Sequence, residues 1–253
     1  MLLANILICT PRQGPLLELP PKVEENTQSF AKIHPEFPHK IFLHDEILEI
    51  LKEKFSPEVA NAFATLKPYA YKADLARYCL LYESGGIYAD LSYFFLNPLP
   101  THQTKIVVFR DFLWSSPWDT SNGVFFSPPK HKSLEYAIEL VCANVRSTYY
   151  GATPLCPTGP ALFGKALAST CEAEEIITGS AMMIPRVKLQ EFHPDLPIPE
   201  EAAIHCLVLN HQLIAIKRKS IGSPGLNDLG ITDGNAYNEL WKNRDVYIQS
   251  ESK

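Results

Sequence analysis

One stretch constrains the fold more than any other, because three signals follow one another there without a gap. Tyr69–Ser84 contains no glycine or proline, which predicts a long helix. Gly85 and Gly86 come next, in the position where helices usually end. Ile87–Ala89 is short and apolar and predicts a strand, and Asp90 stands where that strand ends. A helix that turns directly into a strand is typical of an α/β sheet.

Strands and helices alternate through the first two-thirds of the chain, which predicts an α/β fold with helices on both faces of the sheet. Other strands are expected at Leu2–Cys9, Lys40–Leu43, Tyr93–Leu96, Lys105–Phe109, Val124–Phe126, Ala181–Ile184, Leu207–Leu209 and Leu213–Lys217. Other helices are expected over Glu24–Ile33, after a cap at Asp45, after Ser56, over His131–Val145, from Thr158 to Leu167 and over Tyr237–Tyr247. The segment Ser220–Asn235 is predicted to be a long loop.

Charge excludes one class of partner. The chain has 253 residues with 23 basic and 28 acidic side chains, a formal net charge of −5. A nucleic-acid track needs a basic stripe, and the sequence has no long run of Lys or Arg to supply one. The one basic cluster is Lys217, Arg218 and Lys219. It is interpreted either as a solvated strand end or as a contact for a phosphate-bearing ligand.

The cysteines and the apolar segments indicate the cellular compartment in which the protein is expected. None of the six cysteines forms a C-x-x-C or zinc-finger pattern, and several sit in apolar runs, so reduced thiols and a cytoplasmic location are expected. The opening MLLANILICTPRQ has no basic region or cleavage site and is interpreted as a first strand. No transmembrane run is seen, so a membrane-bound acceptor would be reached by peripheral contact.

Charged side chains share one face of the predicted helix. Asp74, Arg77 and Tyr78 are spaced i, i+3, i+4 among apolar neighbours. A charged pair in such a helix must be neutralised or must face a cleft. Asp90 follows at the carboxyl end of a strand, where ligands bind in open α/β sheets. The spacing therefore suits sugar hydroxyls and a metal–diphosphate, or it describes a structural helix–turn–strand with a surface aspartate.

The segment KADLARYCLLYESGGIYADLS, residues 72–92, resembles the sugar-nucleotide signature of glycosyltransferase family 32 and its relatives, including capsular polysaccharide and mannosyltransferase-type enzymes. The family pattern is a Ser/Ala-Asp-x-x-Arg-Tyr helix followed by Gly-Gly-Ile-Tyr-x-Asp-x-Asp. Weaker similarity covers FPHKIFLHDEILEILKEKF, Asn122-Gly123, Thr158-Gly159-Pro160 and the tail from Asn235. The resemblance implies a GT-A fold, a Rossmann-like mixed sheet flanked by helices, in a single domain over 1–253. Residues 1–100 would form the nucleotide-sugar half, and 101–253 the acceptor side and tail.

The resemblance also implies roles for individual residues. Asp90, Arg77 and Asp74 are predicted to be catalytic, with Asp74 contacting sugar hydroxyls. The predicted donor-binding residues are Cys9, Thr10, Tyr71, Asp74, Arg77, Gly85, Gly86, Tyr88, Asp90, Asn122 and Gly159.

One departure from the family pattern concerns the metal. The second acid of the D-x-D is Ser92, which gives up one full charge. Mn²⁺ or Mg²⁺ would then be held, more weakly, by Asp90, Ser92 and a tail residue such as Asn235, Asp228 or Asp233.

The resulting expectation is a retaining glycosyltransferase of polysaccharide biosynthesis. It would move a hexose from a UDP- or GDP-sugar to a glycan or other hydroxyl acceptor. Two alternatives stay open. The chain could be a non-catalytic module that binds a sugar nucleotide or glycan, which Ser92 favours, or an effector that glycosylates a protein.

Overall fold

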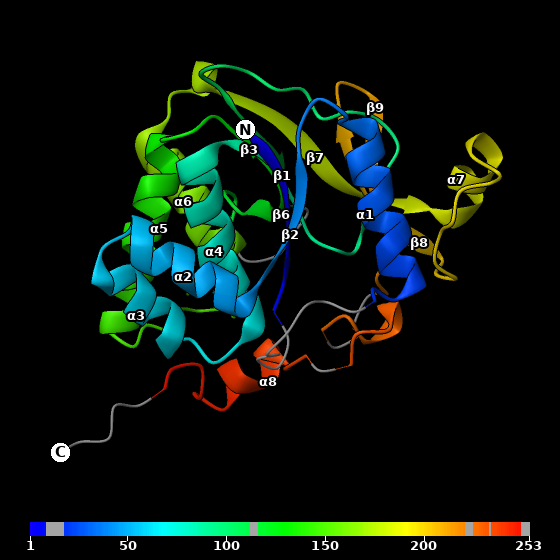
Figure 1. Ribbon diagram of the computed structural model, residues 1–253. Coiled ribbons are helices and arrows are strands. Elements are labelled where there is room, and N and C mark those ends of the chain that lie inside the picture. Colours follow the sequence, from blue (N-terminus) through cyan, green and yellow to red (C-terminus); the bar gives the residue numbers. More distant parts are fainter. Residues whose placement is uncertain (9–17, 112–115, 221–224, 233, 249–253) are drawn as a thin grey trace.

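The computed structural model describes residues 1–8, 18–111, 116–220, 225–232 and 234–248 (Figure 1). The strands are β1 (Leu2–Leu7), β2 (His39–Leu43), β3 (Gly86–Ala89), β4 (Tyr93–Phe95), β5 (Ile106–Arg110), β6 (Thr120–Ser127), β7 (Ile176–Pro185), β8 (Ala203–Leu209) and β9 (Gln212–Lys217). The helices are α1 (Pro21–Ile33), α2 (His44–Lys54), α3 (Pro57–Thr65), α4 (Tyr69–Ser84), α5 (Lys132–Arg146), α6 (Pro160–Thr170), α7 (Arg186–Phe192) and α8 (Tyr237–Lys242), with short 3₁₀ turns at Ala173–Glu175 and Asn227–Leu229.

The described strands form one mixed sheet in the order β2-β1-β3-β6-β5-β7-β8-β9-β4. Strands β1, β2 and β3 pair in parallel, as do β5 and β7, and the other pairs are antiparallel. The structure therefore confirms the predicted α/β class, and a parallel edge formed by β2, β1 and β3, joined to a mostly antiparallel remainder, fits the GT-A fold that the resemblance implied.

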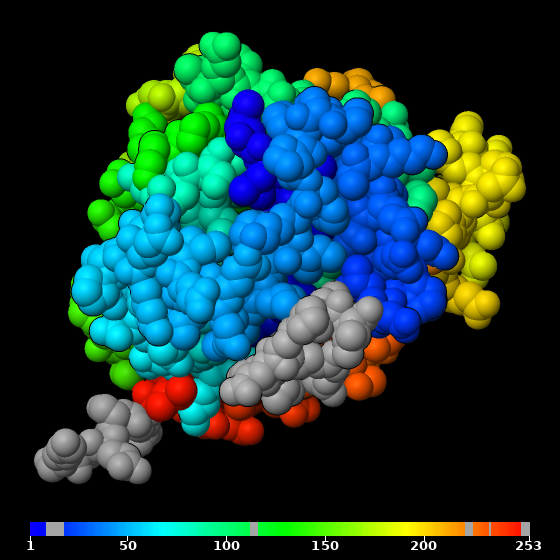
Figure 2. Space-filling view, in the orientation of Figure 1, coloured from blue at the N-terminus to red at the C-terminus, as the bar shows by residue number. Residues whose placement is uncertain are grey.

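Helices cover both faces of the sheet (Figure 1). Because side chains alternate along a strand, β1 sends Leu3 to one core and Ala4 and Ile6 to the other. Helices α2 to α6 close the core of Ala4 and Ile6, while Phe30 of α1 packs in the core of Leu3. Figure 2 shows α1 and α2 over the visible face and the region of α7 projecting at its side.

The glycine pair permits a close approach of two strands. Gly85 and Gly86 have φ angles of 60° and 121°, which L side chains rarely adopt. A Cβ on Gly86 would lie 2.0 Å from the carbonyl oxygen of Leu2, and one on Gly85 would lie 2.6 Å from Cδ of Pro129. The pair thus ends α4 and allows β3 to lie against β1.

Three elements of the structure differ from the predictions. Helix α2 begins at His44, without the side-chain cap expected from Asp45. Helix α7 was not predicted. The tail helix ends at Lys242 instead of Tyr247, because residues 246–248 pair with the backbone at 65–67. Among the described residues, no helix combines the length and apolar composition needed to cross a bilayer.

Candidate functional site

A cavity of about 650 Å³ opens at the carboxyl end of β3. Most of the predicted site residues line it, namely Tyr71, Asp74, Arg77, Tyr88, Asp90, Ser92, Asn122, Gly159 and Asn235. Cys9 and Thr10 lie outside the described residues. The cavity therefore brings together residues from α4, β3, β6, the start of α6 and the tail.

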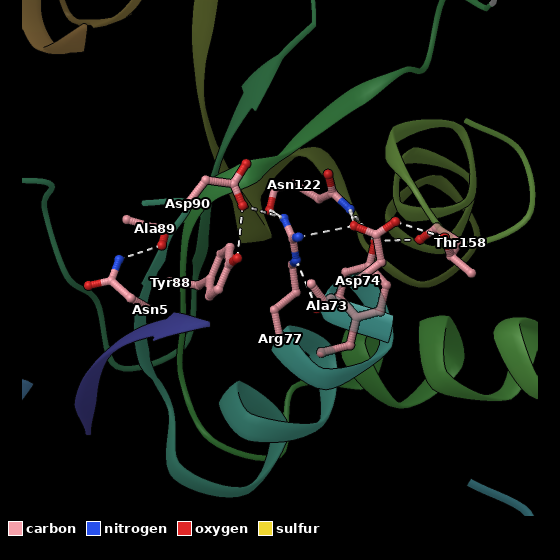
Figure 3. Close-up of polar contacts among 10 residues, drawn as sticks. Asn5, Ala73, Asp74, Arg77, Tyr88, Ala89, Asp90, Asn122 and Thr158 are labelled. Atoms are coloured by element: carbon pink, nitrogen blue, oxygen red, sulfur yellow. Dashed lines mark hydrogen bonds and ion pairs between the residues drawn. The ribbon is translucent and has the colours of Figure 1, made fainter. Parts of the chain in front are cut away.

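Arg77 is the centre of the site (Figure 3). Its Nη2 lies 3.2 Å from Oδ1 of Asp74, and its Nη1 lies 3.2 Å from Oδ1 of Asp90. Nη1 also donates to the carbonyl of Asn122 at 2.6 Å, and the guanidinium stacks 4.3 Å from the ring centre of Tyr88. Burial alone would lower the pKa of Arg77, but Tyr88 and the two carboxylates outweigh it and raise the pKa, so the side chain stays charged.

Asp74 positions Arg77 from inside the protein. Its Oδ1 accepts from Nδ2 of Asn122 at 2.8 Å, and its Oδ2 accepts from the hydroxyl of Thr158 at 2.7 Å. Burial raises the pKa of Asp74, against the opposing effects of Arg77 and Thr158. Because both oxygens already hold protein donors, the structure gives Asp74 a positioning role, and its contact with sugar hydroxyls stays a prediction.

Asp90 is the carboxylate at the mouth of the site. Its side chain is 30% exposed, and its Oδ1 accepts from the hydroxyl of Tyr88 at 2.8 Å besides pairing with Arg77. A Cβ on Gly123 would lie 2.8 Å from Oδ2 of Asp90, so a side chain there would displace this carboxylate. Among the described residues, the side-chain contacts of Asp90 go to Oδ1, which leaves Oδ2 to a ligand.

Gly85 and Gly86 correct the sequence prediction. They were expected to approach the donor, but they lie at the amino end of β3, and neither lines the cavity. The steric reason is that both positions face protein backbone or side chains at contact distance.

The cavity residues that the structure describes do not fit a cation held by the protein alone. Mg²⁺ and Mn²⁺ favour carboxylate and carbonyl oxygens. Asp90 offers one oxygen and Ser92 a neutral hydroxyl, and no group of three or more His, Cys, Asp or Glu in the described part of the chain could hold a metal ion.

The predicted tail ligands do not complete this set. Asn235 was predicted to ligate the metal, but its Oδ1 accepts from the amide of Tyr69 and its Nδ2 donates to the carbonyl of Lys67, both at 2.8 Å. It therefore fastens the tail to the start of α4 and also lines the cavity, and its role as a metal ligand stays a prediction. Oδ2 of Asp228 accepts from the amide of Ser220 at 2.5 Å, and Asp233 lies outside the described residues.

Sequence reasoning missed part of the lining. Tyr93, Asp111, His205 and Tyr237 also border the cavity, and burial lowers the pKa of His205 to about 3, so it is neutral. Lys217 and Lys219 border it as well. Their cluster was visible in the sequence, and the structure favours the interpretation as a ligand contact over a solvated strand end.

Comparison with known proteins assigns a class to this site. The sequence model of the family described as "Glycosyltransferase sugar-binding region containing DXD motif" matches residues 20–111. This range includes the helix–glycine–strand motif, Arg77 and Asp90. Over this part of the chain the sequence is similar to the sugar-binding region of these glycosyltransferases, which confirms the predicted resemblance to family 32.

Parts of the chain are also similar to individual glycosyltransferases. The chain is 30% identical over 127 residues to an uncharacterised glycosyltransferase of Acanthamoeba polyphaga mimivirus, with 47% of each chain covered. It is 28% identical over 115 residues to the mannosyl phosphorylinositol ceramide synthase of Saccharomyces cerevisiae, with 45% of this chain and 29% of the yeast protein covered. The chain thus spans about half the length of the first relative and less of the second. A solved structure of the PaToxG glycosyltransferase aligns with a TM-score of 0.48 at 18% identity, over 66% of this chain and 67% of the other.

Proposed function

We propose that this protein is a glycosyltransferase that moves a hexose from a nucleotide diphosphate sugar to a glycan or other hydroxyl acceptor. One observation carries the proposal: Arg77, fixed by Asp74, holds Asp90 at the mouth of a cavity at the carboxyl end of a sheet strand. Such an edge is where α/β proteins bind nucleotides. The match of the sugar-binding region supports the same conclusion.

The proposed reaction retains the configuration at the sugar. The bond between C1 and the diphosphate oxygen breaks, and its electron pair stays on the diphosphate. The acceptor oxygen attacks C1 from the same face, and its proton passes to the departing phosphate oxygen. Arg77 would stabilise the negative charge that develops, and Oδ2 of Asp90 would accept from a donor hydroxyl. The cavity walls would hold the acceptor hydroxyl close to C1.

A donor panel tests the proposal. The protein is incubated with UDP- and GDP-sugars, with and without Mn²⁺, and the released nucleoside diphosphate is measured. GDP-mannose belongs in the panel because the yeast relative's name describes mannosyl transfer. Release with at least one donor, lost in Asp90→Ala, is the expected result. No release with any donor would remove the catalytic proposal.

Ser92 favours a second candidate, a module that binds a sugar nucleotide without turnover. A neutral hydroxyl stands where the family pattern has an acid. Calorimetry and the donor panel together separate the candidates, because a module would bind a nucleoside diphosphate tightly in the calorimeter and release no nucleotide from any donor in the panel.

A further inference from the structure

Two lysines at and just after the end of β9, Lys217 and Lys219, line the cavity although they lie far in sequence from the helix–glycine–strand motif of residues 72–92. Lys217 ends β9, which pairs antiparallel with β4, with Lys217 opposite Tyr93. Beyond this pair, the amide of Arg218 donates to the carbonyl of Ser92 at 2.7 Å. The sheet itself therefore fixes the lysine segment beside the position where the family pattern has its second acid.

The three basic residues of this segment point in different directions. Arg218 leaves the cavity and pairs with Glu25 at 2.6 Å and Asn26 at 3.2 Å. Lys217 and Lys219, the residues before and after Arg218, both line the cavity. The Nζ of Lys217 lies 5.3 Å from the ring centre of Tyr93. The segment thus contributes two ammonium groups to one pocket.

These ammonium groups are available to a ligand. Among the described residues, neither has an ion-pair or hydrogen-bond partner, whereas the guanidinium of Arg77 is held by Asp74 and Asp90. Lys219 is half-buried, and burial followed by the repulsion of Lys217 lowers its pKa, against the attraction of Asp228 and Asp90. Two like charges crowded beside a pocket are stabilised when an anion enters between them.

Resting on the proposed function, we infer that Lys217 and Lys219 bind the diphosphate of the donor and supply the positive charge for which the family pattern provides a metal ion. The substitution of serine for the second acid and the lysine pair across from it are two parts of one arrangement. Removing a carboxylate weakens a cation site, and two ammonium groups supply positive charge that can balance the diphosphate in its place. Lysine is a common phosphate ligand because its three donors adapt to tetrahedral oxygens.

Calorimetric titration tests this inference without relying on turnover. UDP and GDP are titrated into the protein in EDTA and in Mn²⁺, with uridine and guanosine as ligands that lack the diphosphate. One diphosphate is expected to bind with a dissociation constant that changes less than about threefold between EDTA and Mn²⁺. Lys217→Met and Lys219→Met should each weaken it about tenfold or more, roughly one charge-assisted hydrogen bond, without changing nucleoside binding.

Matched variants separate charge from packing. Lys217→Arg and Lys219→Arg should recover most of the affinity, because they keep the charge. Lys188→Met removes one positive charge from an exposed lysine outside the cavity and should leave binding unchanged. In Ser92→Asp, diphosphate binding in EDTA should weaken and become dependent on Mn²⁺.

The possible outcomes distinguish a failure of the lysine inference from a failure of the proposed glycosyltransferase function. Diphosphate binding that needs Mn²⁺ and ignores both lysines overturns the inference and leaves the proposed function standing. Failure of both UDP and GDP to bind under any condition overturns the two together.

Discussion

The glycine pair and the aspartate of one sequence motif lie at opposite ends of β3, and their surroundings differ. At the amino end, Gly86 lies against the backbone of Leu2, with no space for a side chain. At the carboxyl end, Asp90 is 30% exposed and borders a cavity of about 650 Å³. The amino end of β3 is filled by neighbouring backbone, whereas the carboxyl end is accessible to a ligand.

This difference teaches how to interpret the motif. The glycines and the aspartate occur together because the strand must begin in close contact with β1 before it can deliver a carboxylate to the other edge. The glycine end should therefore govern stability, and the aspartate end should govern binding. Four substitutions sharpen or break this division.

Gly86→Ala has the largest expected effect. Its Cβ would lie 2.0 Å from the carbonyl oxygen of Leu2, at a φ of 121°, so β1 and β3 must separate. We expect the free energy of unfolding to fall by more than about 4 kcal/mol, as for severe overpacking with backbone strain. Urea denaturation measures it. Gly234→Ala is the control, because its Cβ would meet no heavy atom closer than 3.7 Å, and an equal loss there would contradict the steric explanation.

Asp74→Ala tests a residue that we expect to contribute both to stability and to ligand binding. It removes the acceptor of the Thr158 hydroxyl, one of the two acceptors of Asn122 Nδ2 and one of the two ion-pair partners of Arg77. Unfolding free energy should fall by about 3 kcal/mol, the lower end for breaking a buried ion pair, because Asp90 still pairs with Arg77. Donor binding should weaken too, since Arg77 loses its anchor. Urea denaturation and calorimetry measure the two losses, and an unchanged stability would show that Asp74 is not the anchor.

Asp90→Asn should separate binding from stability. Turnover of the active donor should drop about 100-fold or more, as for the loss of one aligned polar group at a reacting centre. Stability should change by less than about 1 kcal/mol, because the side chain is partly exposed and Arg77 keeps Asp74. Nucleotide release and urea denaturation are measured on the same preparation. A large loss of stability with normal turnover would contradict the assignment of ligand binding to the carboxyl end of β3 and of stability to its amino end.

Thr158→Val has the smallest expected effect. It removes the 2.7 Å hydrogen bond to Oδ2 of Asp74 while keeping the side-chain shape. The free energy of unfolding should fall by about 1.5 kcal/mol, typical of a bond to a charged group. Donor turnover should change less than about threefold, since Asn122 and Arg77 still hold Asp74. Denaturation midpoints check the first value, and a turnover loss as large as that of Asp90→Asn would place Thr158 in the site itself.

The sequence could predict the parts of the site that are local. Arg77 and Asp74 share a helix face by spacing alone, and Asp90 follows a strand whose carboxyl end must lie at the sheet edge. These inferences need only helical periodicity and the position of the glycines. The family resemblance added Asn122 and Gly159, which the structure places beside Asp74 and the cavity.

Contacts between distant segments were beyond this reasoning. Lys217 and Lys219 enter the cavity because β9 pairs with β4, and local sequence does not specify which strands pair or in which register. Gly85 and Gly86 were misassigned for the same reason. A glycine that lets backbone approach a ligand and one that lets backbone approach another strand look alike until the neighbouring strand is known.

The central claim is that the carboxyl end of β3 binds an activated sugar. The most direct measurement is a crystal structure of the protein with a saturating nucleotide sugar. The account predicts the sugar beside Oδ2 of Asp90 and the diphosphate against Lys217 and Lys219. A cavity that holds only solvent, or a nucleotide sugar bound elsewhere on the molecule, would contradict it.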